Sequence, residues 1–277
     1  MKWFERWQVR RLLRHRSIPR EPWDRLLNHS PLFRGLHAVE KAHLREQTIL
    51  FLERKSISGA GGLVVSETMA LSVAAVASLP ILRLGMEYYR GWSEVILYPT
   101  AFRVAHEIID EAGVAMRQEE ILVGEAWERG PVILAWEEVA ADLAGRHEGR
   151  NVVLHEFAHK LDMLEGPANG MPPLHPDMVP EQWTRAFSKA FEQVAEEPSS
   201  FSAPHLGEDA AASPAEFFAV ASECFFVAPH KLFKAFPDVY RQLMLFYRQN
   251  PLLRRLGEGR PKTPSRPEGG STFSSDR

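Results

Sequence analysis

The sequence contains a single cysteine, Cys224, among its 277 residues. One thiol excludes an internal disulfide, a cysteine-based zinc finger and an iron–sulfur cluster held by this chain. A lone thiol fits a reducing compartment, where free cysteines persist.

Long apolar runs are also missing. The first residues, MKWFERWQVRRLL, lack the uninterrupted apolar stretch of a signal peptide. The most apolar segment, residues 71–84, is interrupted by polar residues, a proline and Arg83, which leaves it too short to span a bilayer. We therefore expect a soluble cytoplasmic protein without stable membrane insertion.

Neither sign of charge is in large excess, since 33 basic residues face 36 acidic ones for a net charge of -3. This balance gives no reason to expect a direct nucleic-acid partner. Glycine-rich nucleotide-binding motifs and a serine nucleophile elbow are absent as well. The composition is 45% hydrophobic and 25% charged, which is ordinary for a globular protein with a sizeable core.

The chain divides into three parts by composition. Residues 1–27 are basic and rich in tryptophan, which predicts an amphipathic N-terminal segment. This segment either packs its tryptophans on the body of the protein or contacts a membrane surface or a partner. Residues 28–256 form the expected domain, and residues 257–277 form a tail with too little apolar surface to fold.

Helical periodicity dominates the second half of the domain, and short β-rich runs lie in the first half. These patterns predict an α+β fold that is mainly helical with a small β-sheet. Helices are expected at residues 39–56, 67–80, 151–164, 181–195, 213–227 and 231–249, and strands at 63–65, 94–98, 121–123 and 131–136.

The most informative motif is HExxH, formed by His155, Glu156 and His159 on an otherwise apolar helix. Residues four apart share a helix face, so the two imidazoles are placed to bind one zinc ion. Glu156 lies about 100° further round the helix, where it is placed to take a proton from a metal-bound water. The alternative is a surface helix whose polar face binds only water.

A catalytic zinc usually has three protein ligands, and HExxH supplies two. Four residues are candidates for the third. Asp162 shares the face of His159, but three ligands on one helix are crowded, so we favour an outer role in which it accepts an imidazole N–H. His205 lies in a proline- and serine-rich segment, while Glu216 and Glu223 lie two turns apart on the expected helix 213–227.

Glu216 also fits a purely structural role. The residues Ser213-Pro214-Ala215-Glu216 match a capping box, with serine at the N-cap, proline at N1 and glutamate at N3. From these residues alone, the cap is the preferred interpretation of Glu216.

The segments HEFAHKLD and SPAEFFAVASECFF resemble the Mlc titration factor A family of metallopeptidases. The segments LFLERK, GAGGLVVSETMALSVAAVASLPIL, YYRGWSEVILYP and GPVILAW are similar to that family too, so the resemblance covers residues 25–255. It implies a zincin-like, gluzincin-type domain in which Glu216 is the third zinc ligand. Glu223 then lies in the outer shell and holds an imidazole.

The resemblance further implies aminopeptidase-like zinc-dependent hydrolysis of a peptide or protein substrate, and binding of the glucose repressor Mlc. Two positions depart from the family pattern. Asp209 stands where the family often has a tyrosine that steadies the oxyanion, and Met116 stands where some members carry a metal-contacting histidine.

A regulatory protein that sequesters the repressor without cutting it, with a structural zinc, is the alternative function. A site of two imidazoles and one carboxylate also accepts other divalent metals.

Overall fold

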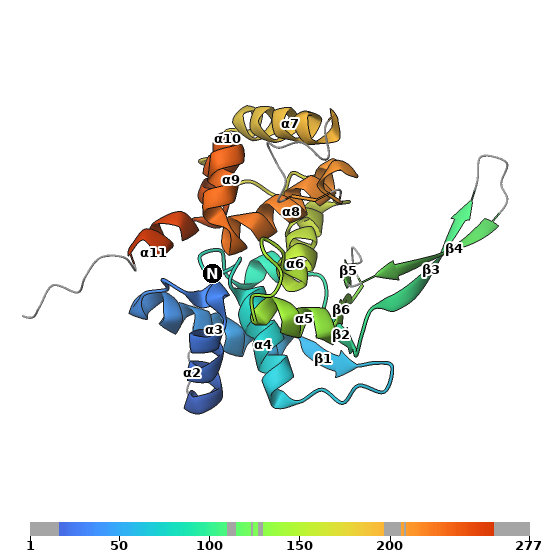
Figure 1. Cartoon of the computed structure of the whole chain (residues 1–277), viewed down its shortest axis with the longest axis vertical. Coiled ribbons are helices and arrows are strands. Elements are labelled where there is room, and N and C mark those ends of the chain that lie inside the picture. Colours follow the sequence, from blue (N-terminus) through green and yellow to red (C-terminus); the bar gives the residue numbers. More distant parts are fainter. Residues whose placement is uncertain are drawn as a thin grey trace, which may run out of the picture.

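The structure, a computed structural model, describes residues 17–109, 115–122, 124–126, 130–196, 206–207 and 209–257. Residues 1–16 of the basic N-terminal segment, His205, and the tail from residue 258 lie outside this part of the chain. Within it the protein is mostly helical with a small sheet, as the α+β prediction requires (Figure 1).

Helices form in all six stretches where the sequence predicts them, and α5 and α11 are additional. Their bounds are α2 Arg20–His29, α3 Ala38–Arg54, α4 Glu67–Ser78, α5 Trp136–Leu143, α6 Val152–Asp162, α7 Pro180–Glu196, α8 Pro214–Val227, α9 Pro229–Ala235, α10 Pro237–Tyr247 and α11 Pro251–Gly257. The short 3-10 helices are η1 Pro31–Phe33, η2 Met86–Tyr89, η3 Met163–Glu165 and η4 Asp209–Ala211.

The strands form a four-stranded sheet with the order β1-β2-β6-β5 and a separate hairpin of β3 and β4. Strands β1, β2 and β6 are parallel, while β5 pairs antiparallel with β6 at one edge. The hairpin projects from the body of the protein (Figure 1). The bounds are β1 Ser56–Gly59, β2 Glu94–Tyr98, β3 Phe102–Ile109, β4 Ala115–Leu122, β5 Gly124–Ala126 and β6 Val132–Ala135.

One predicted strand is wrong. Residues 63–65 form no strand, and the Val64 side chain is 87% exposed. The edge strand is instead the more polar segment Ser56–Gly59, whose backbone pairs in register with Glu94–Leu97 of β2. Backbone pairing with a buried neighbour therefore outweighs the higher β-propensity of the Leu-Val-Val run.

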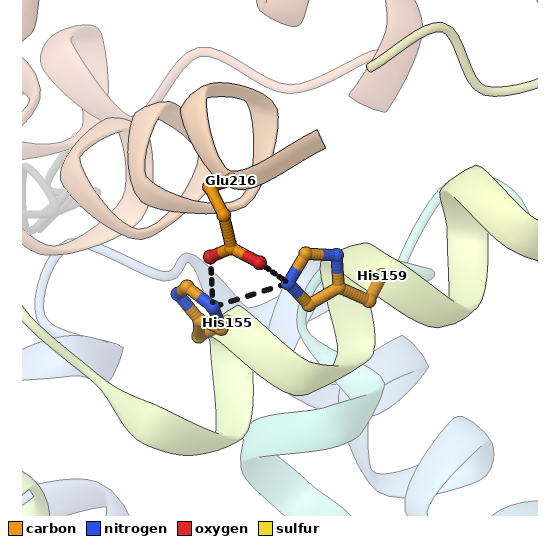
Figure 2. Close-up of side chains that lie close together, drawn as sticks. All are labelled: His155, His159 and Glu216. Carbon is orange, nitrogen blue, oxygen red and sulfur yellow. Dashed lines mark hydrogen bonds and ion pairs between the residues drawn. The ribbon is translucent and has the colours of Figure 1, made fainter. Parts of the chain in front are cut away.

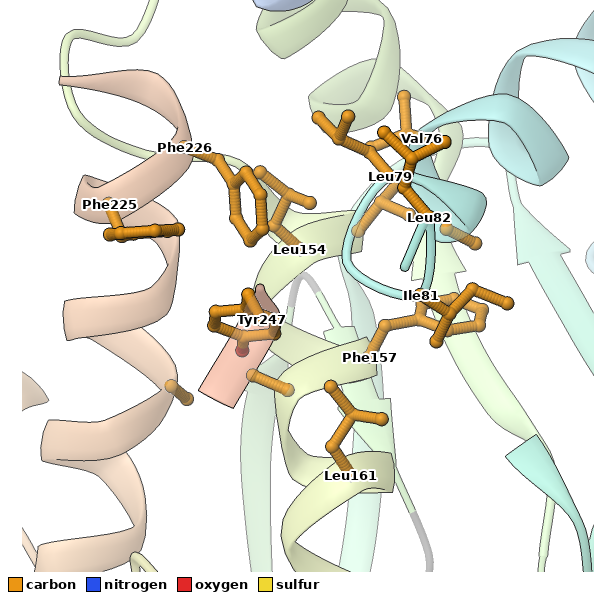
Figure 3. Close-up of a cluster of buried hydrophobic side chains, with 14 of the residues drawn as sticks. Val76, Leu79, Ile81, Leu82, Leu154, Phe157, Leu161, Phe225, Phe226 and Tyr247 are labelled. Carbon is orange, nitrogen blue, oxygen red and sulfur yellow. The ribbon is translucent and has the colours of Figure 1, made fainter. Parts of the chain in front are cut away.

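Helix α6 runs through the centre of the core. Its residues Leu154, Phe157 and Leu161 are at most 1% exposed and pack among side chains from α4, α8 and α10 (Figure 3). Phe157 also contacts the aromatic rings of Tyr89 and Trp92, with centroids 5.1 and 5.6 Å away. Burying each large side chain stabilises the fold by about 1.5–3 kcal/mol, so this face fixes the rotation of α6 about its axis.

Helix α2 joins the N-terminal region to this core. Trp23 and Leu27 are buried, and Arg45 of α3 lies 5.9 Å from the centre of the Trp23 ring. The boundary drawn at residues 27 and 28 from composition thus falls inside one helix that packs on the domain.

Candidate metal centre

The first turn of α6 is held by three side-chain acceptors. The backbone N–H of Asn151 donates to Glu223 Oε2 at 2.6 Å, that of Val152 to Asp142 Oδ2 at 2.7 Å, and that of Leu154 to Asn151 Oδ1 at 3.0 Å. Helix N-termini otherwise leave such donors unpaired. Because they are satisfied here by groups from α5 and α8, the start of α6 is fixed against both helices.

His155 and His159 lie on the face of α6 that turns toward the first turn of α8. Their Nε2 atoms are 3.1 Å apart, and each is 3.2 Å from a different oxygen of Glu216 (Figure 2). The structure thus brings together the two histidines of the motif and one of the four candidate third residues. The Glu216 side chain remains 33% exposed, so solvent reaches this cluster.

Ser213 is the N-cap of helix α8, as the capping motif predicts. Ser213 Oγ accepts the backbone N–H of Glu216 at 3.1 Å, and Pro214 occupies the first turn. The Glu216 carboxylate, however, faces the imidazoles. Only half of the capping box is formed, and the same serine cap orients the helix that carries Glu216.

Glu223 contacts the opposite side of the His155 ring. Its Oε1 lies 2.6 Å from His155 Nδ1 while its Oε2 accepts the Asn151 N–H. A carboxylate only accepts, so Nδ1 carries a proton, and Nε2 is the ring nitrogen that faces Glu216 and His159. An imidazole whose proton is held on Nδ1 is left with Nε2 as the atom that would bind a metal ion.

The donor set fits a divalent metal such as zinc. Bonds of about 2.0–2.1 Å at tetrahedral angles place neighbouring ligand atoms about 3.3 Å apart. The observed separations of 3.1 and 3.2 Å are close to this value. His155, His159 and Glu216 each offer one ligand atom within 4.8 Å of the other two, and this is the one such cluster among the described residues.

The charges around the cluster shift its pKa values. Burial raises the pKa of Glu156 to about 7, although the neighbouring histidines act against this. Burial lowers the pKa of His155, but the carboxylates of Glu223 and Glu216 more than offset it and the net shift is upward. Burial similarly raises the pKa of Glu216, and its hydrogen bonds with the two imidazoles bring it below the usual range.

Glu156 itself is 5% exposed and lies on α6 between the two histidines in sequence. A buried carboxyl with a pKa near neutrality is suited to accepting and releasing a proton.

The Asp162 side chain contacts a loop backbone instead of the imidazole that the sequence suggested. Its Oδ2 accepts the backbone N–H groups of Asn169 and Gly170 at 2.8 and 2.7 Å, and its Oδ1 is buried without a hydrogen-bond partner. Among the described residues it therefore holds a loop and accepts no imidazole N–H. The sequence contained a signal for this role in the turn-forming residues Gly166 to Gly170, which directly follow the helix.

The structure adds little on Asp209 and Met116, the two positions that depart from the family pattern. Asp209 is exposed in η4, where its Oδ2 is 3.4 Å from the Arg150 guanidinium. Met116 falls on strand β4, for which the structure describes the backbone alone.

Comparison with known proteins agrees with this geometry. A family model described as glucose-regulated metallo-peptidase M90 matches residues 4–248. The chain belongs to this family. Proteins named Mlc titration factor A from Yersinia pestis (strain Pestoides F) and Yersinia pseudotuberculosis serotype O:1b (strain IP 31758) are each similar to it. Both are 35% identical over 237 residues, which cover 84% of this chain and 86% of the relative.

The M90 match includes α6 and α8, so the three clustered residues all lie inside it.

In the described part of the chain, no helix combines the length and hydropathy needed to cross a bilayer.

Proposed function

We propose that this protein is a zinc-dependent peptidase with a zincin-like, gluzincin-type site. The proposal is carried by the convergence of His155, His159 and Glu216 at 3.1–3.2 Å, with the buried carboxyl of Glu156 beside them. Family membership supports a metallopeptidase.

In this proposal His155, His159 and Glu216 hold the ion, and Glu223 keeps His155 in its metal-binding tautomer. Zinc, when bound, supplies a Lewis acid that polarises the substrate carbonyl and acidifies water. Glu156 takes a proton from the attacking water and returns it to the leaving amine, and its raised pKa suits both transfers.

The substrate backbone is proposed to bind along β5. This strand is the sheet edge next to β6 and packs beside α6. An edge strand presents unpaired backbone groups to which an extended peptide adds as a further strand.

We also propose that the protein binds an Mlc-like transcriptional repressor, which places it in the cytoplasm. The support is the name of its relatives, Mlc titration factor A. A binding protein with a structural metal would satisfy that name without peptidase activity.

Glu156→Gln separates the two functions, because it removes the proton acceptor and leaves the three proposed ligands in place. We expect loss of hydrolysis of peptides, tested with free and with acetylated N-termini, while zinc content and repressor binding persist. Hydrolysis at the wild-type rate by Glu156→Gln would show that the catalytic assignment is wrong.

The metal itself is tested by elemental analysis of tag-free protein beside His155→Ala. We expect about one zinc per wild-type chain and its loss in the variant. Wild-type protein that stays zinc-free after zinc is supplied and excess dialysed away would leave only the binding function.

A further inference from the structure

The loop that follows α6 leads to α7 and contacts the first turn of α8, so it touches both helices of the candidate metal centre. Asp162 is the last residue of α6, one turn beyond His159, and it binds the backbone of Asn169 and Gly170. One end of this loop is thereby anchored to the helix that carries both histidines.

Gly170 forms the other contact. It is buried and has a φ of +81°, and a Cβ atom placed on it would lie 2.4 Å from the carbonyl oxygen of Pro214. No side chain fits in that space, so the loop backbone lies directly against the first turn of α8. The Gly170 carbonyl also accepts the indole N–H of Trp183 at 3.1 Å, which ties the same point to α7.

This contact bears on the metal centre because Glu216 lies only two residues after Pro214. The first turn of a helix lacks part of its backbone hydrogen bonding, so its position depends on neighbouring groups. Further along α8, Glu223 is already held by Asn151 and His155. Beside the packing of the apolar faces of α6 and α8, two contacts therefore tie α8 to α6 and its loop, and the one at Gly170 is nearer the Glu216 carboxylate along the chain.

We infer that Gly170 is a positioning residue for the metal centre. By its close contact with Pro214 it sets the distance between Glu216 and the two histidines, with Asp162 and Trp183 holding Gly170 in place. This inference rests on the proposed metal site. It adds that the affinity for the ion depends on a backbone contact outside the ligand set.

The test is Gly170→Ala with Gly62→Ala as its matched control. Gly62 has a φ of +83°, but a Cβ there would meet nothing within 4 Å. Both alanines carry the same backbone strain, and only the one at residue 170 pushes against α8. The readouts are zinc affinity by chelator competition, the absorption spectrum after Co²⁺ substitution, and the thermal unfolding midpoint.

We expect Gly170→Ala to bind zinc about 10–100-fold more weakly than the wild type and to show an altered Co²⁺ spectrum. Gly62→Ala carries the backbone strain without the steric contact, so it should lower the unfolding midpoint by less and keep wild-type zinc affinity and spectrum. Equal zinc affinity and identical spectra for the two variants would overturn the inference.

Trp183→Phe covers the case in which Gly170→Ala does not fold. Phenylalanine retains an aromatic ring to stack on Phe187, whose centroid lies 4.2 Å away, and removes the N–H that Gly170 accepts together with the volume of the second ring. A folded Trp183→Phe protein should bind zinc several-fold more weakly, and wild-type affinity in that variant would refute the inference. Wild-type protein that binds no zinc overturns the metal site itself, which separates the two failures.

Discussion

Replacing Glu223 by glutamine should weaken metal binding without removing a ligand. The carboxylate accepts two hydrogen bonds, from His155 Nδ1 and from the Asn151 N–H, each at 2.6 Å. Glutamine has the same shape but only one oxygen, so it accepts one of these bonds and presents an N–H to the other donor. Either His155 loses the acceptor of its Nδ1 proton, or the Asn151 N–H at the start of α6 loses its acceptor.

The size of the effect follows from the lost bond. A hydrogen bond to a charged group contributes about 1.5–3 kcal/mol. Loss of a carboxylate that orients a metal-binding histidine typically weakens metal affinity about 10–100-fold, which corresponds to about 1.4–2.7 kcal/mol. The two estimates agree, so we expect Glu223→Gln to bind zinc about 10–100-fold more weakly at pH 7.

Zinc competition against a chelator of known affinity measures this directly. Glu165→Gln is the matched control, because it makes the same change at an exposed ion pair with Arg90, 3.3 Å apart. That control should stay within about twofold of the wild type, since exposed ion pairs contribute little. A Glu223→Gln protein that folds and binds zinc as tightly as the wild type would refute the proposed tautomer control.

Three further outcomes are expected. Arg254→Met removes the 2.9 Å partner of the buried Glu40 carboxylate, which keeps Arg83 at 3.9 Å, and should destabilise the fold by about 3 kcal/mol in urea unfolding. Arg241→Met, at an exposed ion pair, should change the stability by less than about 0.5 kcal/mol. Burial, with nearby Lys160 and Arg54, lowers the pKa of Lys55 to about 8 in the folded protein. In the unfolded chain Lys55 has its ordinary, higher pKa, so it stays protonated to a higher pH than in the folded protein. The unfolding free energy of the wild type relative to Lys55→Met should therefore increase between about pH 8 and 9.5, by about 1 kcal/mol, and a flat difference would contradict this. Zinc at about 100 times its Kd should stabilise the wild type by about 2.7 kcal/mol in thermal unfolding, with no shift for His159→Ala.

Local patterns in the sequence were sufficient for most of the elements. The 3.6-residue period around His155 predicted the helix that carries the motif, and β2 forms over the predicted residues Glu94–Tyr98. Helix α5 was missed because its first residue, Trp136, directly follows the buried β6 strand and continues its apolar run. A strand was predicted at residues 63–65 and forms instead at Ser56–Gly59, since strand pairing depends on a partner that is distant in the sequence.

The sequence by itself determined that His155 and His159 share a helix face, because spacing along one helix fixes their relative direction. It left the third residue open, since Glu216 and Glu223 share a face and their distance from the histidines depends on how two helices pack. Only the tertiary structure placed Glu216 against both Nε2 atoms, Glu223 behind His155, and Asp162 on the loop backbone. These contacts join residues far apart in the chain, and burial of the apolar faces of α6 and α8 decides them.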